Sequence, residues 1–177
     1  MAKLVSKVYG DAYVSVVSDK NNLNVALDEI KAIKDIFVKN DEIVLLLDSP
    51  KMDDEEKVSF LKGIFEHHIS DDSMGLLLTV IEKKRQAELS AILDYVTDCI
   101  KELLLIGKAT IATALPLDDA KKERIVEELI KSSRYKSLEA KFIVDESILG
   151  GIVIRIGDRV VDSSVKTRIE KMRKMLS

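Results

Sequence analysis

The stretch SILGGIVIRIGDRVVD, residues Ser147 to Asp162, decides the fold of the second half of the chain. Behind two adjacent glycines, the segment Ile152 to Ile156 alternates isoleucines with other residues, which is the period of a half-buried β-strand. Gly157 and Asp158 have the chemistry of a tight hairpin turn, so Arg159 to Val161 is predicted to pair back as a short strand. The stretch therefore predicts a β-hairpin that belongs to a small sheet.

The glycine pair before this hairpin, Gly150 and Gly151, is compatible with two roles. Glycines that cradle a phosphate are followed by a helix whose N-terminal amides face the anion, whereas a strand follows here. The stretch also lacks the lysine and hydroxyl residue of a P-loop, and it does not fit the G-x-G-x-x-G pattern. We therefore interpret the pair as a structural turn that needs a positive φ angle or a close backbone approach.

The flanking segments complete an α/β pattern. GKATIATALPL, from Gly107 to Leu117, has the β-branched character of a strand, and an amphipathic helix begins at Asp118. Leu138 to Asp145 alternates as another strand, and a basic helix closes the chain after Asp162 to Ser164. Residues 107–177 are thus predicted to form a small α/β C-terminal domain, in which the glycine turn lets the last helix fold back on the sheet.

The first half has a different period, because apolar residues recur every three or four positions up to Ile106. Its first predicted helix carries the apolar stripe Leu4, Val5, Val8, Ala12 and Val16. Further helices are predicted at about 23–40, 53–67, 74–84 and 87–106. The short apolar segment EIVLLLDSP, which Pro50 closes, has no assigned structure. Residues 1–106 are therefore predicted to form an α-helical N-terminal bundle of about six helices.

Composition restricts the kinds of partner. Apolar residues make up 46% of the chain and charged residues 33%, as in a globular protein with a core. The net charge of −3 provides no positive field for nucleic acid or an anionic membrane, so we expect protein partners. The longest apolar run falls short of the ~20 residues that a membrane-spanning helix needs, so no direct membrane insertion is expected. The first residues lack the apolar core of a signal peptide, and the lone Cys99 forms no internal disulfide, so we expect a cytoplasmic location.

No catalytic, cofactor or metal site is predicted. His67 and His68 are the only histidines, and adjacent helical residues point about 100° apart, so they do not converge on one metal ion. No nucleophile-elbow sequence accompanies them. The acidic run Asp53 to Glu56 lacks the alternating ligands and the glycine of a calcium loop, and it suits the first turn of a helix instead.

Four segments together resemble the delta subunit family of F-type ATP synthase, which includes the mitochondrial oligomycin-sensitivity-conferring protein. The most specific is FIVDESILGGIVIRIGDRVVDSSVKTRIEKMRKML, Phe142 to Leu176, with its glycine pair, basic apolar strand and D-x-S opening to a last helix. VYGDAY (Val8 to Tyr13), LLLTVIEKKR (Leu76 to Arg85) and ATALPL (Ala112 to Leu117) match weaker family patterns in the family's order. The resemblance covers nearly the whole chain.

The resemblance implies a non-catalytic subunit of the peripheral stalk, or stator, which holds the catalytic head still while proton- or sodium-driven rotation is coupled to ATP synthesis. It implies two partners: the N-terminal helix of an alpha subunit on the helical bundle, and subunit b on the C-terminal domain. The protein would then lie on the cytoplasmic side of the cell membrane as a peripheral part of the complex.

The positions that the resemblance assigns to the alpha-subunit helix lie on the first and fifth helices: Tyr9, Ala12, Tyr13, Leu76, Leu77, Val80 and Ile81. The same spacing fits the core of the bundle, and pattern alone does not separate a core position from a binding position. Gly10 and Asp11 stand where the family commonly has alanine and lysine. A glycine inside a helix costs about 1 kcal/mol relative to alanine, so the first helix is where the chain departs most from the family.

Two other functions stay open. One is an unrelated helical adaptor, such as a stalk subunit of a vacuolar-type ATPase, with the same overall pattern of helices and sheet. The other is a small enzyme that uses only carboxylates, which a cleft with paired acids of perturbed pKa would indicate.

Overall fold

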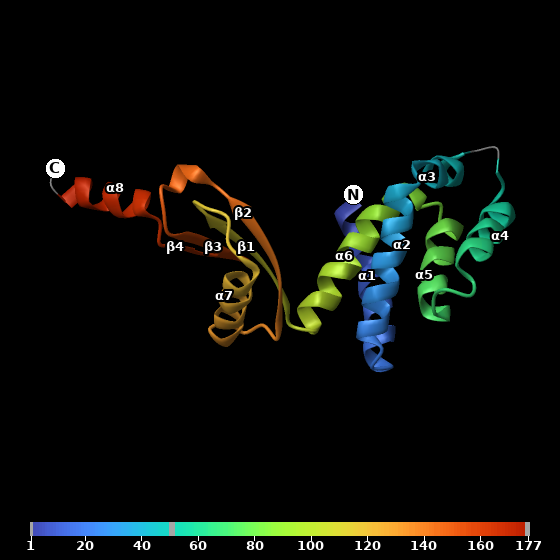
Figure 1. Ribbon diagram of the computed structural model, residues 1–177. Coiled ribbons are helices and arrows are strands. Elements are labelled where there is room, and N and C mark those ends of the chain that lie inside the picture. Colours follow the sequence, from blue (N-terminus) through green and yellow to red (C-terminus); the bar gives the residue numbers. More distant parts are fainter. Residues whose placement is uncertain (1, 50–51, 176–177) are drawn as a thin grey trace. The chain divides into compact units, whose positions relative to one another are not determined.

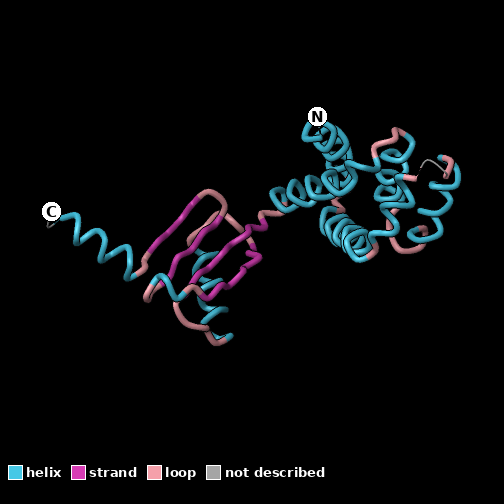
Figure 2. The backbone as a smooth tube through the Cα atoms, turned by 90° about the horizontal axis from the view of Figure 1, so that it is seen from above, coloured by secondary structure: helices cyan, strands magenta, loops and turns pink. Residues whose placement is uncertain are grey.

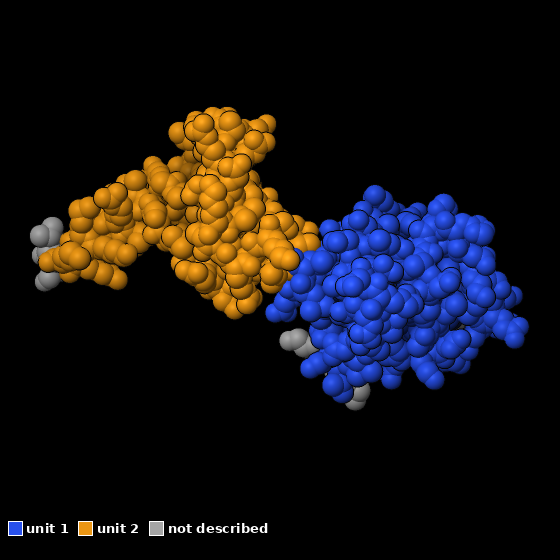
Figure 3. All heavy atoms as spheres, turned by 90° about the horizontal axis from the view of Figure 1, so that it is seen from below, with its two compact units in different colours: residues 1–104 blue, residues 105–177 orange. Residues whose placement is uncertain are grey.

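The computed structural model describes residues 2–49 and 52–175, and the chain divides between Leu104 and Leu105 into two compact units (Figure 3). The sequence places the division slightly later, between Ile106 and Gly107. We call residues 1–104 the first unit and residues 105–177 the second, and each is described by itself.

The first unit consists of helices (Figure 1). They are α1 (Ala2–Asp19), α2 (Leu23–Lys39), α3 (Asp41–Asp48), α4 (Asp54–Phe65), α5 (Asp71–Glu82), the short 3₁₀ helix η1 (Gln86–Glu88) and α6 (Leu89–Leu103). α1 packs most extensively on α6, which also contacts α2, while α5 contacts α1 and α4. The prediction of a bundle of about six helices is confirmed for the described residues, and the unassigned apolar segment forms α3.

Apolar side chains from four helices fill the centre of this bundle. Those without solvent exposure include Ile30 and Ile33 of α2, Leu61 of α4, Leu77 and Val80 of α5, and Ile92, Leu93, Val96 and Ile100 of α6. Full burial of such a side chain contributes roughly 1.5–3 kcal/mol, so these side chains together provide a large favourable contribution to the folding of the bundle. The acidic run begins α4 as a capping box, in which Asp53 Oδ1 accepts from the Glu56 amide at 2.8 Å.

The second unit is a four-stranded sheet with two α-helices (Figure 2). Its elements are β1 (Ile106–Thr113), α7 (Asp119–Lys131), β2 (Ser137–Val144), the 3₁₀ helix η2 (Glu146–Ile148), β3 (Ile152–Ile156), β4 (Arg159–Asp162) and α8 (Val165–Met175). The strand order is β2-β1-β3-β4. β1 and β2 are parallel and are connected by α7, whereas the pairs β1–β3 and β3–β4 are antiparallel. The predicted fold class, a helical bundle followed by a small α/β domain, is confirmed.

The register of the sheet separates an apolar face from a polar face. Ile111 pairs with Phe142 of β2 and with Ile154 of β3, so these three side chains share one face. Leu129 of α7 and Ile154 line one cavity, and α7 contacts β2, so the helix lies over this face. Arg155 belongs to the opposite face and is exposed. The alternation read from the sequence therefore corresponds to a sheet that is buried on one side.

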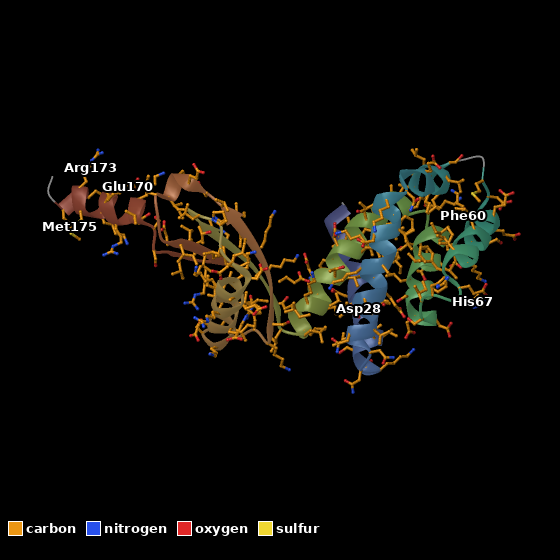
Figure 4. The ribbon with its side chains drawn as sticks, viewed as in Figure 1. Asp28, Phe60, His67, Glu170, Arg173 and Met175 are labelled. Atoms are coloured by element: carbon orange, nitrogen blue, oxygen red, sulfur yellow. The ribbon has the colours of Figure 1, made fainter. Side chains whose placement is uncertain are left out.

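The closing helix α8 does not fold back on the sheet, so that expectation is wrong. None of its described side chains is buried, and Figure 4 shows Glu170, Arg173 and Met175 projecting from it. A backbone hydrogen bond of 3.0 Å from the Val165 amide to the Gly150 carbonyl holds only the first turn against the preceding loop. The rest of the helix extends beyond the end of the sheet (Figure 1).

Candidate functional site

The seven predicted binding positions all lie on α1 and α5, which contact each other in the first unit. The four positions on α5, Leu76, Leu77, Val80 and Ile81, are only 0–6% exposed and form part of the core. On α1, Tyr13 is buried, Tyr9 is half-buried and Ala12 is exposed. The structure therefore brings the predicted helices together but turns most of the predicted side chains toward the interior.

Tyr13 is bonded to α5 inside the bundle. Its hydroxyl lies 2.7 Å from Ser73 Oγ, and burial raises the pKa of Tyr13 to about 12. The phenol therefore stays protonated at any physiological pH and acts as a hydrogen-bonding group of the core.

The outer side of α1 exposes an apolar stripe. Leu4, Val8 and Val16 are all exposed, and the exposed Ala12 lies between them at the same four-residue spacing. Sequence periodicity identifies this stripe but predicts it as a face that packs inside the bundle. Exposed apolar residues that continue along one helix face are typical of a binding surface rather than of scattered surface hydrophobics.

The hydrogen bonds of α1 to α5 and α6 show which of these helices lies next to the stripe. Lys20 Nζ bonds Asp72 of α5 at 2.7 Å, on the same side of α1 as Tyr13. Asp11 instead accepts from Tyr95 of α6. With about 100° between successive residues, Tyr9, Ala12 and Val16 lie between the α5-facing side and solvent. The part of the stripe formed by Ala12 and Val16 therefore borders α5.

The exposed side of α5 beside this stripe carries small residues. Gly75 and Thr79 are both exposed, and nothing lies within 4 Å of the position that a Cβ of Gly75 would take. A glycine and a small side chain let a partner backbone approach closely. We define the α1–α5 face by five residues: Tyr9, Ala12, Val16, Gly75 and Thr79.

In the second unit, α8 presents another unburied apolar stripe. It consists of Val165, Ile169, Met172 and Met175, and all four are exposed. Five basic residues flank the stripe: Lys166, Arg168, Lys171, Arg173 and Lys174. Glu170 is the single acidic residue of the helix. This combination suits a partner helix with an apolar stripe and acidic flanks.

The first turn of α8 is held by Asp162. Its carboxylate accepts from the Ser164 amide at 2.8 Å and from the Thr167 hydroxyl at 2.7 Å. The Ser164 amide is the main reason that the pKa of Asp162 is lowered, because the hydrogen bond favours the ionised form. Asp118 and Asp145 also have a lowered pKa and also accept hydrogen bonds where a helix begins. These shifts belong to capping carboxylates rather than to paired acids in a cleft.

The two predicted turn glycines differ in their constraints. Gly151 has a φ angle of +80°, and a Cβ there would lie 2.5 Å from the Ser163 carbonyl oxygen. A Cβ at Gly150 would lie 3.1 Å from Val165 Cγ2, a side-chain atom. Leu149, just before the pair, adopts a left-handed conformation with φ of 65°. The backbone requirement for glycine therefore lies at Gly151.

The histidines form no site with other ligands. His67 and His68 are exposed just beyond α4, where Figure 4 labels His67, and the described residues contain no group of three or more potential metal ligands. Across residues 2–49 and 52–175, no helix combines the length and hydrophobicity that crossing a membrane requires.

Comparison with known proteins gives consistent matches over the whole chain. The family model described as ATP synthase delta (OSCP) subunit matches residues 5–176. ATP synthase subunit delta of Lachnoclostridium phytofermentans is 42% identical over 176 residues, which cover 99% of this chain and 97% of that protein. Its counterpart from Lactobacillus acidophilus is 32% identical over 169 residues, or 96% and 92% of the two chains. A chain in the cryo-EM structure of the Toxoplasma gondii mitochondrial ATP synthase hexamer has the same fold, with a TM-score of 0.69, 18% identity, and coverage of 97% and 96%.

Proposed function

Because this chain belongs to the ATP synthase delta (OSCP) subunit family, we propose that it is a non-catalytic subunit of the peripheral stalk of an F-type ATP synthase. In this role it links the catalytic head to the stalk, so that ion-driven rotation is coupled to ATP synthesis. It acts on the cytoplasmic side of the cell membrane as a peripheral member of the complex. A vacuolar-type stalk subunit is not favoured, because the family match spans residues 5–176.

The α1–α5 face is the proposed docking site for the N-terminal helix of an alpha subunit. The observation that carries this assignment is the exposed apolar stripe of α1, whose part at Ala12 and Val16 borders the small residues of α5. An amphipathic helix that lays its apolar face over this stripe would remove it from water, at roughly 25 cal/mol per Å² of apolar surface. The buried α5 residues Leu77 and Val80 would then support the face from beneath instead of touching the partner.

Subunit b is the proposed partner of α8. The stripe and the five basic residues of this helix are accessible along its length, and an acidic amphipathic helix complements both features. The two docking sites then lie on different units, as a protein that connects two parts of a complex requires.

Calorimetric titration of the full chain with a peptide from the N-terminus of the same organism's alpha subunit tests the first assignment. We expect saturable one-to-one binding with a negative heat-capacity change, because apolar surface is buried. Val16→Asp should weaken binding by about tenfold or more, since a charge would be placed in the contact. Val25→Asp on α2 is the control, because Val25 is also exposed, at 55% against 44% for Val16, and lies outside the α1–α5 face.

Two results would contradict the assignment. One is the absence of binding to a folded chain. The other is equal weakening by Val16→Asp and Val25→Asp, which would move the docking site away from the α1–α5 face.

A further inference from the structure

A carboxylate on α2 is hydrogen-bonded to the start of α5. Glu29 Oε1 accepts from the Ser70 amide at 2.9 Å, and Glu29 Oε2 accepts from the Ser70 hydroxyl at 2.7 Å and from the Ser73 hydroxyl at 2.5 Å. Ser70 is the N-cap residue of α5, and Ser73 lies in its first turn. The negative charge therefore lies where the α5 dipole is positive, and it fixes this end of α5 to α2.

The connection continues to α1 in a defined direction. A serine hydroxyl has a single hydrogen, and Ser73 donates it to the Glu29 carboxylate. The Tyr13 hydroxyl must therefore be the donor in its 2.7 Å contact with Ser73. Tyr13 and Ser73 are buried and Glu29 is half-buried, so this chain runs from the interior of the bundle at α1 and α5 toward its surface at α2, and in the interior each hydrogen bond strengthens the next.

This network lies directly beneath the proposed docking surface. Tyr13 follows Ala12 on α1, and Ser73 precedes Gly75 by half a turn on α5, so the two bonded residues are on the inner side of the turns that form the α1–α5 face. A partner helix that spans α1 and α5 requires one fixed distance between them, and misplacement by about 1 Å is enough to weaken such a contact.

We propose that Glu29 is a positioning residue for partner recognition: from α2, and without touching the partner, it sets the spacing of α1 and α5 that the docked helix needs. This inference rests on the proposed function of the α1–α5 face. A purely structural role would predict that loss of the carboxylate lowers stability and leaves the affinity of the folded protein unchanged.

The test uses the full chain and the alpha-subunit peptide described above. Glu29→Gln keeps the size of the side chain, but its amide nitrogen cannot accept from Ser70 or Ser73. We expect affinity to fall roughly tenfold under conditions where the variant is fully folded, because the partner helix must then restore the spacing of α1 and α5 when it binds. Asp53→Asn is the matched control, because it makes the same change in the capping carboxylate of α4. It should lower the unfolding midpoint and leave the affinity as in the wild type.

A second variant keeps the test decisive if Glu29→Gln does not fold. Tyr13→Phe removes one hydroxyl from the far end of the network and should also weaken binding. In the double variant the two effects should be less than additive, since both break one network. Wild-type affinity in folded Glu29→Gln or Tyr13→Phe would overturn the inference and leave the docking site standing. Absence of peptide binding to the wild type would overturn the docking site itself.

Discussion

The Tyr95 hydroxyl donates a hydrogen bond to Asp11 Oδ1 at 2.8 Å, which joins α6 to α1. The ring of the same tyrosine lies against Gly10, where a Cβ would come within 2.3 Å of Tyr95 Cδ1. The two positions at which the first helix departs from the family are therefore matched to one aromatic side chain. The glycine makes room for the ring, and the acid binds its hydroxyl. Gly10 would weaken α1 as an isolated helix, but in the folded protein it lets α1 pack closely against α6.

Gly10→Ala should destabilise the protein although alanine is the better helix former. The gain in helix propensity is about 1 kcal/mol, whereas forcing a methyl group against a packed ring costs about 1–3 kcal/mol. Urea unfolding followed by circular dichroism measures the balance. Gly63→Ala in α4 is the control, because nothing lies within 4 Å of its Cβ position, and it should stabilise the protein by up to about 1 kcal/mol. Stabilisation by both substitutions would show that Tyr95 does not constrain Gly10.

Gly151→Ala should destabilise the second unit and spare the first. The new methyl group would meet the Ser163 carbonyl oxygen in a left-handed conformation, and neither the backbone nor the φ angle adjusts easily. Limited proteolysis with mass spectrometry should then show faster cleavage after residue 105 and an unchanged first unit. Gly150→Ala should have a smaller effect, because a side-chain atom of Val165 is its nearest neighbour. If the wild type and Gly151→Ala resist proteolysis equally, position 151 does not require glycine.

The cap of α8 should weaken in acid. The folded-state pKa of Asp162 lies below the ordinary value of 3.8, so its contribution to stability is present above that value and is lost as the pH falls through the lowered pKa. Asp162→Asn keeps an accepting oxygen but has no charge to titrate. The thermal midpoint of the wild type should therefore exceed that of the variant at pH 7, and the two should converge as the pH falls below the lowered pKa of Asp162. If the difference between the two thermal midpoints does not depend on pH, the cap stabilises α8 through the geometry of its hydrogen bonds rather than through its charge.

The periodicity of apolar residues predicted where the helices and strands lie better than it predicted which of their faces are buried. The stripe from Leu4 to Val16 and the α5 residues from Leu76 to Ile81 have the same helical spacing, yet the first is largely exposed and the second is buried. Spacing defines an apolar face, whereas its burial depends on contacts between distant segments. α3 has only 8 residues, which is too short for a helical period to be distinguished from a strand. Glu29 had no sequence signal, because its partners lie more than 40 residues away.

Ile169→Asp should abolish binding of subunit b of the same organism, whereas Val160→Asp on β4 should leave it intact. The two positions are matched, since Ile169 is 51% exposed and Val160 53%, but only Ile169 lies on the α8 stripe. Lys171→Glu should mainly slow association and reduce its salt dependence, because a flanking charge steers the encounter and the apolar stripe provides the contact. Surface plasmon resonance at two salt concentrations separates the effects. Loss of binding with Val160→Asp but not with Ile169→Asp would place subunit b on the sheet rather than on α8.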